Sequence, residues 1–248
     1  MSPRLPPILV GTSGWSYRHW RGPFYPLDLP ARRWLAYYLQ FFRSVEINSS
    51  FYRLVPERTL IQWRDSVPAG FVFAMKGSRY ITHMKRLTGP QGLQRFMARA
   101  ELLGDKLGPI LFQLPPHWHL DLERLQSFLG MLPKDHRFAM EFRDPTWWVP
   151  EVYELLERHA VAFCIFELGG LCSPLKLTAD VAYVRLHGPG GAYQGQYSDQ
   201  ALGRWAETFK RWRRGGRTVY CYLDNDQAGY AAQDAQRLQA LVSGRNSR

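Results

Sequence analysis

Acidic, basic and amide side chains stand at the ends of seven short apolar runs in this sequence. The runs end in Glu46-Ile47-Asn48, Lys76, Gln113, Glu141-Phe142-Arg143, Glu167, Arg185-Leu186-His187 and Asp224-Asn225-Asp226. Side chains two residues apart share a face of a strand, so Glu141 is expected beside Arg143 and Arg185 beside His187. Carboxylates, imidazoles and cations that converge in this way are suited to acid–base chemistry on an anionic compound.

We expect Glu141 to act as general acid or base with Glu46 as its partner, and His187 and His83 to transfer protons. The residues expected to bind a small anionic, phosphorylated substrate are Arg143, Arg185, Lys76, Asn48, Gln113, Tyr52, Trp147, Gly190, Gly191, Asn225 and Asp226. Hydrolysis, isomerisation and lyase chemistry all remain open. The alternative is that the charged strand ends are paired with one another and only close the structure.

The sequence His187-Gly-Pro-Gly-Gly191 strengthens the expectation of an anion site. Its glycines expose backbone N–H groups, and consecutive N–H groups form nests for anions. A divalent metal is a further alternative, because Glu46, Glu141, His187 and Asp226 would supply ligands for magnesium, manganese or zinc. These four residues lie far apart in the sequence, so their spacing does not test whether they form one metal site. Metal use therefore stays open, and no other cofactor is assigned.

The elements that would position these residues follow from apolar periodicity. Strands are expected at residues 8–11, 44–48, 71–76, 109–113, 137–142, 162–167, 182–187 and 218–223. Helices are expected at residues 31–42, 57–66, 91–104, 121–132, 150–160, 199–214 and 228–242. Gly169, Gly170 and Pro174 follow the sixth strand, so the sixth helix is expected to be reduced or missing.

Eight strands that alternate with helices in 248 residues predict an α/β fold, a single-domain (β/α)8 TIM barrel over residues 1–248 with short flexible termini. Active residues of such barrels stand at the carboxyl ends of the strands, where the polar residues above lie. A doubly wound parallel sheet is the alternative fold.

Composition restricts the class of protein further. Hydrophobic residues make up 46% and charged residues 21% of the chain, which is typical of a folded globular protein. No apolar run approaches the ~18 residues of a membrane span, and the first residues lack the apolar segment of a secretory signal. Three cysteines without CxxC spacing predict no disulfide framework. We therefore expect a cytoplasmic protein with no membrane partner.

The net charge of +11 leaves a second function open. A protein that binds or cleaves nucleic acid would use such a charge, and Lys210-Arg-Trp-Arg-Arg214 with Arg217 is the densest basic segment. One alternative is that the arginine enrichment reflects genome composition or thermostability. Another is that the basic segment is a solvated helix end, because cations at a helix C-terminus are favoured without any ligand.

Several motifs resemble signatures of the YecE-like family, also called domain of unknown function 72. They are Val10-Gly-Thr-Ser-Gly-Trp-Ser-Tyr17, Val45-Glu-Ile-Asn-Ser-Ser-Phe-Tyr52, Ile81-Thr-His83, Leu107-Gly-Pro-Ile-Leu-Phe-Gln-Leu-Pro-Pro116, Glu141-Phe-Arg143 with Trp147, Arg185-Leu-His-Gly188 and Asn225-Asp226. The resemblance runs from about residue 8 to 241. It implies a TIM barrel and carries no settled reaction. This chain departs from the family pattern at Asp224, where the family tends to have Asn, and at Glu167, where it usually has Asp.

Overall fold

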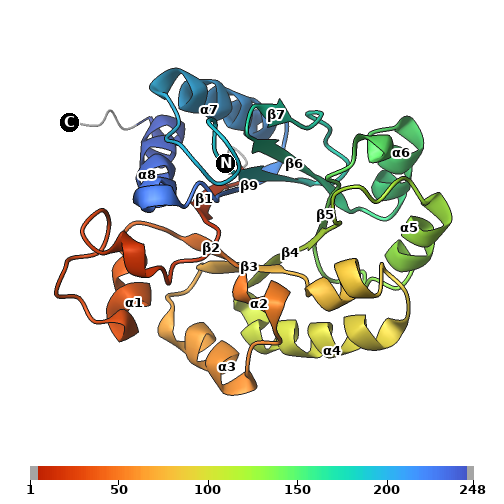
Figure 1. Cartoon of the computed structure of the whole chain (residues 1–248), viewed down its shortest axis with the longest axis horizontal. Coiled ribbons are helices and arrows are strands. Elements are labelled where there is room, and N and C mark those ends of the chain that lie inside the picture. The colour runs from red at the N-terminus through yellow and green to blue at the C-terminus, as the bar shows by residue number, and fades with distance from the viewer. Residues whose placement is uncertain (1–4, 245–248) are drawn as a thin grey trace. The chain divides into compact units, whose positions relative to one another are not determined.

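The computed structural model describes residues 5–244 of the chain (Figure 1). Its internal contacts divide it into two compact units. We name them the terminal unit, which comprises residues 5–45, 165–173 and 180–244, and the central unit, which comprises residues 46–164 and 174–179. Two strands, β2 (Ser44–Ile47) and β6 (Ala162–Leu168), contribute residues to both units.

The terminal unit is built on three parallel strands. β1 (Ile8–Thr12) pairs with β9 (Thr218–Leu223), and β9 pairs with β8 (Val181–Leu186). The α-helices of this unit are α1 (Trp34–Tyr38), α7 (Asp199–Arg214) and α8 (Tyr230–Ser243). Short 3-10 helices lie at Arg18–Trp20, Ala31–Arg33 and Gln227–Gly229.

The central unit has the same construction. β3 (Val72–Lys76), β4 (Leu107–Gln113), β5 (Phe138–Glu141) and the start of β6 pair in that order, and every pair is parallel. Its α-helices are α2 (Ser49–Tyr52), α3 (Glu57–Ser66), α4 (Pro90–Ala100), α5 (Leu122–Leu129) and α6 (Pro150–Arg158). It also holds 3-10 helices at Glu101–Lys106 and Pro145–Trp147 and a π-helix at Tyr80–Met84.

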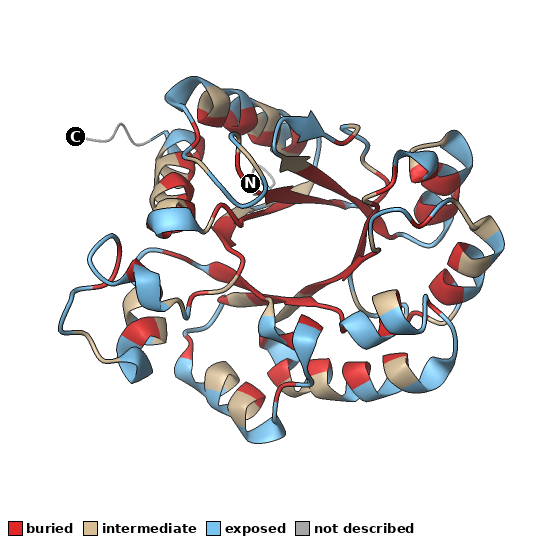
Figure 2. Ribbon diagram, in the orientation of Figure 1, coloured by how far each residue is buried: buried red, intermediate tan, exposed pale blue. Residues whose placement is uncertain are grey.

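Most strand residues are buried, as Figure 2 shows in red, whereas both residues of β7 are exposed. Every residue of β5 and β8 is buried, which is usual for parallel strands because helices cover them. In α4 the buried side chains are Leu93, Phe96, Met97 and Ala100, at the three- and four-residue spacing of one helical face. The charged residues of the strands, such as Glu46, Glu141 and Arg185, lie at or near the carboxyl ends of their strands.

All eight expected strands are present, with small shifts at their ends. All seven expected helical segments are present too, although the one at 31–42 divides into Ala31–Arg33 and α1. Between β6 and β8 the structure has no helix, as predicted. A short antiparallel strand, β7 (Leu171–Cys172), folds back on β6 instead. Gly169 and Gly170 make this turn at φ values of 57° and 85°, a left-handed conformation that glycine adopts without steric cost.

None of the helices between residues 5 and 244 combines the length and the apolar character that a membrane crossing requires.

Two glycines of the terminal unit differ in the space around them: Gly11 in β1 is tightly packed, and Gly203 in α7 is not. A Cβ built at Gly11 would lie 2.2 Å from the backbone oxygen of Ser44, whereas one at Gly203 in α7 would meet nothing within 4 Å. Gly11→Ala should therefore lower the free energy of unfolding by about 1–3 kcal/mol. Gly203→Ala should raise it by about 0.5–1 kcal/mol because alanine favours helix. Urea unfolding followed by circular dichroism measures both, and an unchanged midpoint for Gly11→Ala would contradict the packing described.

Candidate functional site

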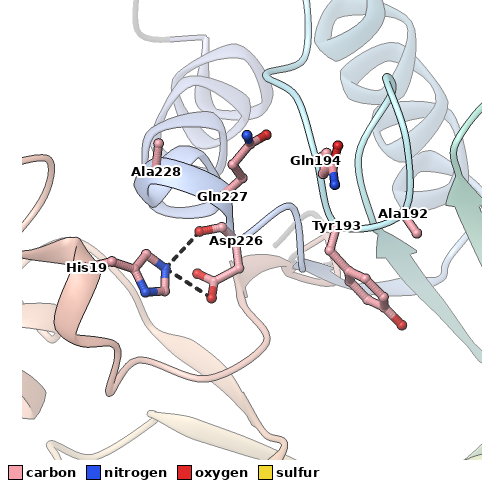
Figure 3. Close-up of a pocket in the computed structure, with 7 residues that line it drawn as sticks. All are labelled: His19, Ala192, Tyr193, Gln194, Asp226, Gln227 and Ala228. Atoms are coloured by element: carbon pink, nitrogen blue, oxygen red, sulfur yellow. Dashed lines mark hydrogen bonds and ion pairs between the residues drawn. The ribbon is translucent and has the colours of Figure 1, made fainter.

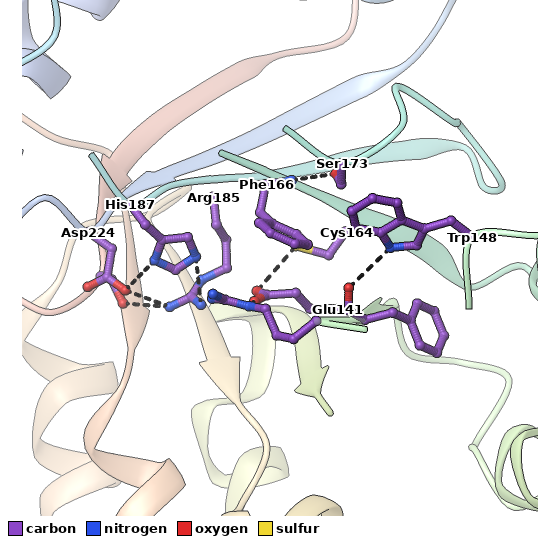
Figure 4. Close-up of polar contacts among 11 residues, drawn as sticks. Glu141, Trp148, Cys164, Phe166, Ser173, Arg185, His187 and Asp224 are labelled. Atoms are coloured by element: carbon purple, nitrogen blue, oxygen red, sulfur yellow. Dashed lines mark hydrogen bonds and ion pairs between the residues drawn. The ribbon is translucent and has the colours of Figure 1, made fainter. Parts of the chain in front are cut away.

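At the end of β8 in the terminal unit, Arg185, His187 and Asp224 form a buried hydrogen-bonded cluster (Figure 4). Arg185 Nη2 donates to Asp224 Oδ2 at 3.1 Å, and His187 Nδ1 lies 3.0 Å from the same oxygen. Arg185 Nη2 also donates to Ser13 Oγ at 3.2 Å. The buried charges are therefore compensated within the cluster, as burial requires.

Asp224 sets the orientation of the His187 imidazole. A carboxylate oxygen accepts at Nδ1, so the neutral ring carries its proton there. The ring of Tyr193 packs at right angles to the imidazole with centroids 5.4 Å apart, and the Tyr193 backbone N–H donates to the His187 carbonyl at 2.6 Å. His187 is thus a rigidly held imidazole oriented by a carboxylate, which suits proton transfer and equally suits a structural role.

Asp226 has different partners from Asp224. Trp20 Nε1 donates to its Oδ1 at 2.6 Å, and His19 Nε2 lies 3.1 Å from its Oδ2. Burial raises the pKa of the Asp226 carboxyl above its ordinary value, although the contacts with Trp20 and His19 offset part of this effect. The alternation that would place Asp224 and Asp226 on one face ends with β9 at Leu223.

Asn225 fastens the glycine-rich loop that follows β8. Its Nδ2 donates to the Gly195 carbonyl and to Asp234 Oδ2, both at 2.9 Å. Asp234 is fully buried and also accepts the Tyr197 backbone N–H at 2.9 Å. Burial raises the pKa of the Asp234 carboxyl, and these donors offset part of the shift. Asn225 and Asp234 therefore hold the loop in place.

Gly190 and Gly191 lie in that loop, and a Cβ added at Gly169, just beyond the end of β6, would lie 3.4 Å from Gly191 Cα. Gly190 is exposed, and an added Cβ there would meet nothing within 4 Å. The Gly191 carbonyl accepts the backbone N–H of Gln194 at 3.2 Å. The expected anion nest at these glycines stays a prediction.

The central unit brings Lys76, Gln113 and Glu141 to one edge, at the carboxyl ends of β3, β4 and β5. Lys76 pairs in register with Leu111, and Gln113 pairs with Glu141. The exposed fractions of Lys76, Gln113 and Glu141 are only 6%, 9% and 0%. An ammonium, an amide and a carboxyl group are therefore withdrawn from bulk water along the same edge.

Both oxygens of Glu141 have partners within the central unit (Figure 4). Arg143 Nε forms a charged hydrogen bond with Oε1. The thiol of Cys164 donates to Oε2 at 3.7 Å. The predicted pairing of Glu141 with Arg143 on one face is thus present in the structure, with the carboxylate held on both sides.

The short helix α2 places the ring of Phe51 beside Lys76. Lys76 Nζ lies 4.3 Å from the centroid of this ring, a cation–π contact. The imidazole of His83 packs against the same ring at right angles, with centroids 5.1 Å apart. The Ser50 hydroxyl lies 2.6 Å from the Lys76 carbonyl, which fixes α2 on the end of β3. Phe51 therefore serves as a platform for an ammonium and an imidazole.

His83 is held in the form that accepts a proton. Its pKa is lowered from the ordinary value by burial and then by the positive charges of Lys76 and Arg79. His83 Nδ1 lies 2.8 Å from Thr82 Oγ1 in the π-helix. A neutral imidazole beside a buried cation is a suitable general base for an anionic compound.

Two buried amide oxygens in the central unit, Asn48 Oδ1 and Gln113 Oε1, have no hydrogen-bond partner among residues 5–244. A buried acceptor without a partner is unfavourable, and such groups often face a ligand or an unseen water. Tyr52, which follows Phe51, is 68% exposed and packs against the Phe51 ring at 5.1 Å. The residues expected to bind substrate thus include acceptors that a hydroxyl-bearing ligand would satisfy.

Two other expected residues are fully buried. Trp147 stacks on Phe142 with centroids 4.9 Å apart, so it supports the chain beyond β5 from within. Glu46 is buried at the end of β2.

The described residues contain no group of three or more His, Cys, Asp or Glu side chains arranged to hold a metal ion. Glu46, Glu141, His187 and Asp226 therefore do not make up such a group. The Asp226 carboxylate has His19 and Trp20 as partners instead.

The basic segment at the end of α7 does not present its aromatic residue to solvent. Trp212 is buried and packs on Phe209 with centroids 5.8 Å apart. Lys210 Nζ is paired with Glu207 at 2.9 Å. At this segment, the nucleic-acid alternative therefore rests on positive charge, because its aromatic residue is not available for base stacking.

The residues of these clusters that sequence reasoning missed include Phe51, Arg79 and His19. Phe51 lies five residues after Glu46, within the family-like motif that ends at Tyr52. Its place in that motif was the one sequence feature that pointed to a role in the site. Arg79 and His19 lie in segments without a strand-end pattern, so nothing in their spacing distinguished them.

Solved structures identify the fold class. A DUF72 family protein from Thermotoga maritima aligns with a TM-score of 0.86 at 28% identity, covering 96% of this chain and 99% of that one. A DUF72 family protein from Enterococcus faecalis aligns with a TM-score of 0.83 at 18% identity, covering 97% and 96%. The chain has the (β/α)8 fold of TIM barrels, as the sequence predicts.

Residues 9–248 match the family described as protein of unknown function DUF72, and the chain belongs to that family. The resemblance seen in the sequence motifs is thereby confirmed. UPF0759 protein YunF of Bacillus subtilis (strain 168) is 24% identical in an alignment 277 positions long, gaps included, which covers 95% of this chain and 94% of that protein.

The positive charge of Lys76 should be measurable at His83. Lys76→Met removes a charge that lowers the pKa of His83, so this pKa should rise, and Lys85→Met is the control because Lys85 is not among the causes of the shift. Titration of the imidazole protons by NMR measures it. Equal pKa values in the two variants would contradict the coupling.

The same shift has a consequence for stability. Because the folded pKa of His83 is lowered, the unfolded chain binds the proton more readily. The contribution of neutral His83 to the free energy of unfolding is therefore complete above about pH 6.5, and it declines as the pH falls toward the pKa of the folded state. Urea unfolding at several pH values should show a smaller acid loss of stability in Lys76→Met than in Lys85→Met.

The two carboxylates that contact Arg237 allow a matched test of the loop anchor. Asp234 is fully buried and contacts Arg237 Nη1 at 2.6 Å, whereas the Asp199 side chain, which contacts Nη2, is 90% exposed. Asp234→Ala should lower the free energy of unfolding by about 3 kcal/mol, because buried donors lose their acceptor. Asp199→Ala should leave the urea midpoint close to that of the wild type. Equal losses in the two variants would disprove the anchoring role of Asp234.

Proposed function

We propose that this protein is an enzyme that acts by acid–base chemistry on a small anionic substrate at the carboxyl ends of β3, β4 and β5 in the central unit. The observation that carries the proposal is the buried ammonium of Lys76 over Phe51, with the imidazole of His83 against the same ring. A cation withdrawn from water attracts an anion more strongly than an exposed one.

Lys76 supplies the anion-binding charge, and Arg79 adds to the positive potential felt by His83. A bound phosphate or carboxylate group would offset both charges. It would therefore raise the pKa of His83 toward the range in which this imidazole exchanges a proton near neutral pH. Binding of the anion and readiness for proton transfer are coupled in this arrangement.

Glu141 is the second acid–base group of the proposal. Arg143 and Cys164 fix its two oxygens, so the carboxylate keeps one orientation while a substrate binds. Arg143 also provides a cation that would stabilise negative charge developing on the substrate. These groups serve a hydrolase, an isomerase or a lyase.

The substrate carries hydroxyl or N–H groups as well as its negative charge. The buried oxygens of Asn48 and Gln113 have no partner among the described residues, and only a donor satisfies them. A small phosphorylated or carboxylated hydroxy compound provides both features.

Calorimetric titration with inorganic phosphate and with a panel of sugar phosphates and hydroxy acids tests the proposal. Lys76→Met and Gln113→Ala should each weaken binding at least about tenfold, which corresponds to ~1.4 kcal/mol. Lys85→Met is the matched control, because Lys85 Nζ also lies over an aromatic ring, that of Tyr80 at 5.7 Å, but is exposed. Equal affinities of Lys76→Met and Lys85→Met for every anion that binds would reject the site, as would the absence of binding by the whole panel.

A further inference from the structure

The terminal unit contains a pocket that the proposed function does not use (Figure 3). Its volume is ≈ 480 Å³, within the range of small-molecule sites. The residues that line it are His19, Ala192, Tyr193, Gln194, Asp226, Gln227 and Ala228. They come from the segment after β1, the loop after β8 and the segment after β9, so three connections at strand ends form its walls.

The charge of the walls argues against an anionic ligand. No lysine or arginine lines the pocket, and its one carboxylate, Asp226, would repel a phosphate. His19 and Trp20 hold the two oxygens of that carboxylate at 3.1 and 2.6 Å. Because these contacts already offset its charge, Asp226 is also a poor counter-ion for an ammonium group. Its oxygens keep further lone pairs that accept hydrogen bonds.

The remaining polar groups both donate and accept. Gln194 and Gln227 each provide an amide group, and Figure 3 shows Gln194 and Tyr193 on the side of the pocket opposite His19. Gln227 Oε1 already accepts the Gly195 backbone N–H at 3.2 Å, so its amide is held in place. Hydroxyl groups also donate and accept, and they therefore match this lining.

Tyr193 provides the apolar surface. Tyr193 is 45% exposed, and its ring packs against the imidazole of His187, which holds it in place. Among the described residues, six non-glycine residues have a left-handed φ, and two of these line the pocket: Tyr193 at 64° and Ala228 at 53°. Such backbone strain gathers at functional sites, where the surrounding structure holds it.

We propose that this pocket binds an uncharged, hydroxyl-rich ligand of the monosaccharide or polyol class, with hydroxyl groups on Asp226, Gln194 and Gln227 and a C–H face against the ring of Tyr193. This pocket shares no residue with the proposed anion site, whose residues belong to the central unit. A ligand of this class binds through several modest hydrogen bonds and one aromatic contact, so its affinity is in the millimolar range.

The test is titration of the whole protein with D-glucose, D-galactose and D-mannitol, followed by ligand-observed NMR. Glucose-6-phosphate and tetramethylammonium chloride report on the anionic and cationic alternatives. Tyr193→Asn removes the ring but keeps a residue that tolerates left-handed φ, and Gln194→Ala removes one amide. Gln196→Ala is the control, because Gln196 is an amide of the same loop whose Nε2 contacts Gln233 outside the pocket.

At least one of the three neutral compounds should bind saturably. Tyr193→Asn and Gln194→Ala should each weaken this binding about tenfold, while Gln196→Ala and Lys76→Met should leave it unchanged. Binding of none of the three, or binding that Tyr193→Asn and Gln194→Ala leave intact, would overturn the proposal. A preference for tetramethylammonium or for the phosphorylated sugar at this pocket would overturn it as well. The Lys76→Met result separates its failure from failure of the anion site.

Discussion

The ammonium group of Lys76 is the charge on which the candidate site of the central unit depends. It stands at the end of β3 with 6% of the residue exposed, and the ring of Phe51 lies 4.3 Å from it. Ser50 ties α2 to the Lys76 carbonyl and so keeps that ring in place. His83 packs on the same ring and owes part of its lowered pKa to Lys76. The attraction for an anion thus depends on this buried cation, which also adds to the effect of burial in lowering the pKa of His83.

The two units treat buried charge in different ways. In the terminal unit, Arg185 and Asp224 compensate each other and both contact His187, and Asn225 Oδ1 is buried without a hydrogen-bond partner among the described residues. That arrangement also fits a purely structural role. In the central unit, the amide oxygens of Asn48 and Gln113 are buried without a partner among the described residues. Folding has already removed these oxygens from water, so a ligand that donates hydrogen bonds to them gains binding free energy without a further desolvation cost on the protein side. The central edge combines two such oxygens with the buried cation of Lys76, and this combination favours substrate chemistry there.

The strands were predictable because parallel strands covered on both faces read as continuous apolar runs. The same pattern located the polar residues at the strand ends. It did not predict α2, whose four residues are too few to show helical periodicity, nor the π-helix that carries His83, whose period differs from that of an α-helix. It also did not predict that Asp224 and Asp226 have different partners, because the alternation of side chains between two faces stops where β9 ends. Side-chain contacts between distant segments, such as His19 with Asp226, leave no local signal in a sequence.

The most direct test of the central claim is to locate a bound anion in a crystal. Crystals of the protein soaked in tungstate, a tetrahedral dianion like phosphate, would reveal each site by anomalous scattering. We expect the strongest tungsten peak beside Lys76 Nζ, within reach of His83. A strongest peak at the basic C-terminal end of α7, or at the exposed loop of Gly190, with none beside Lys76, would contradict it.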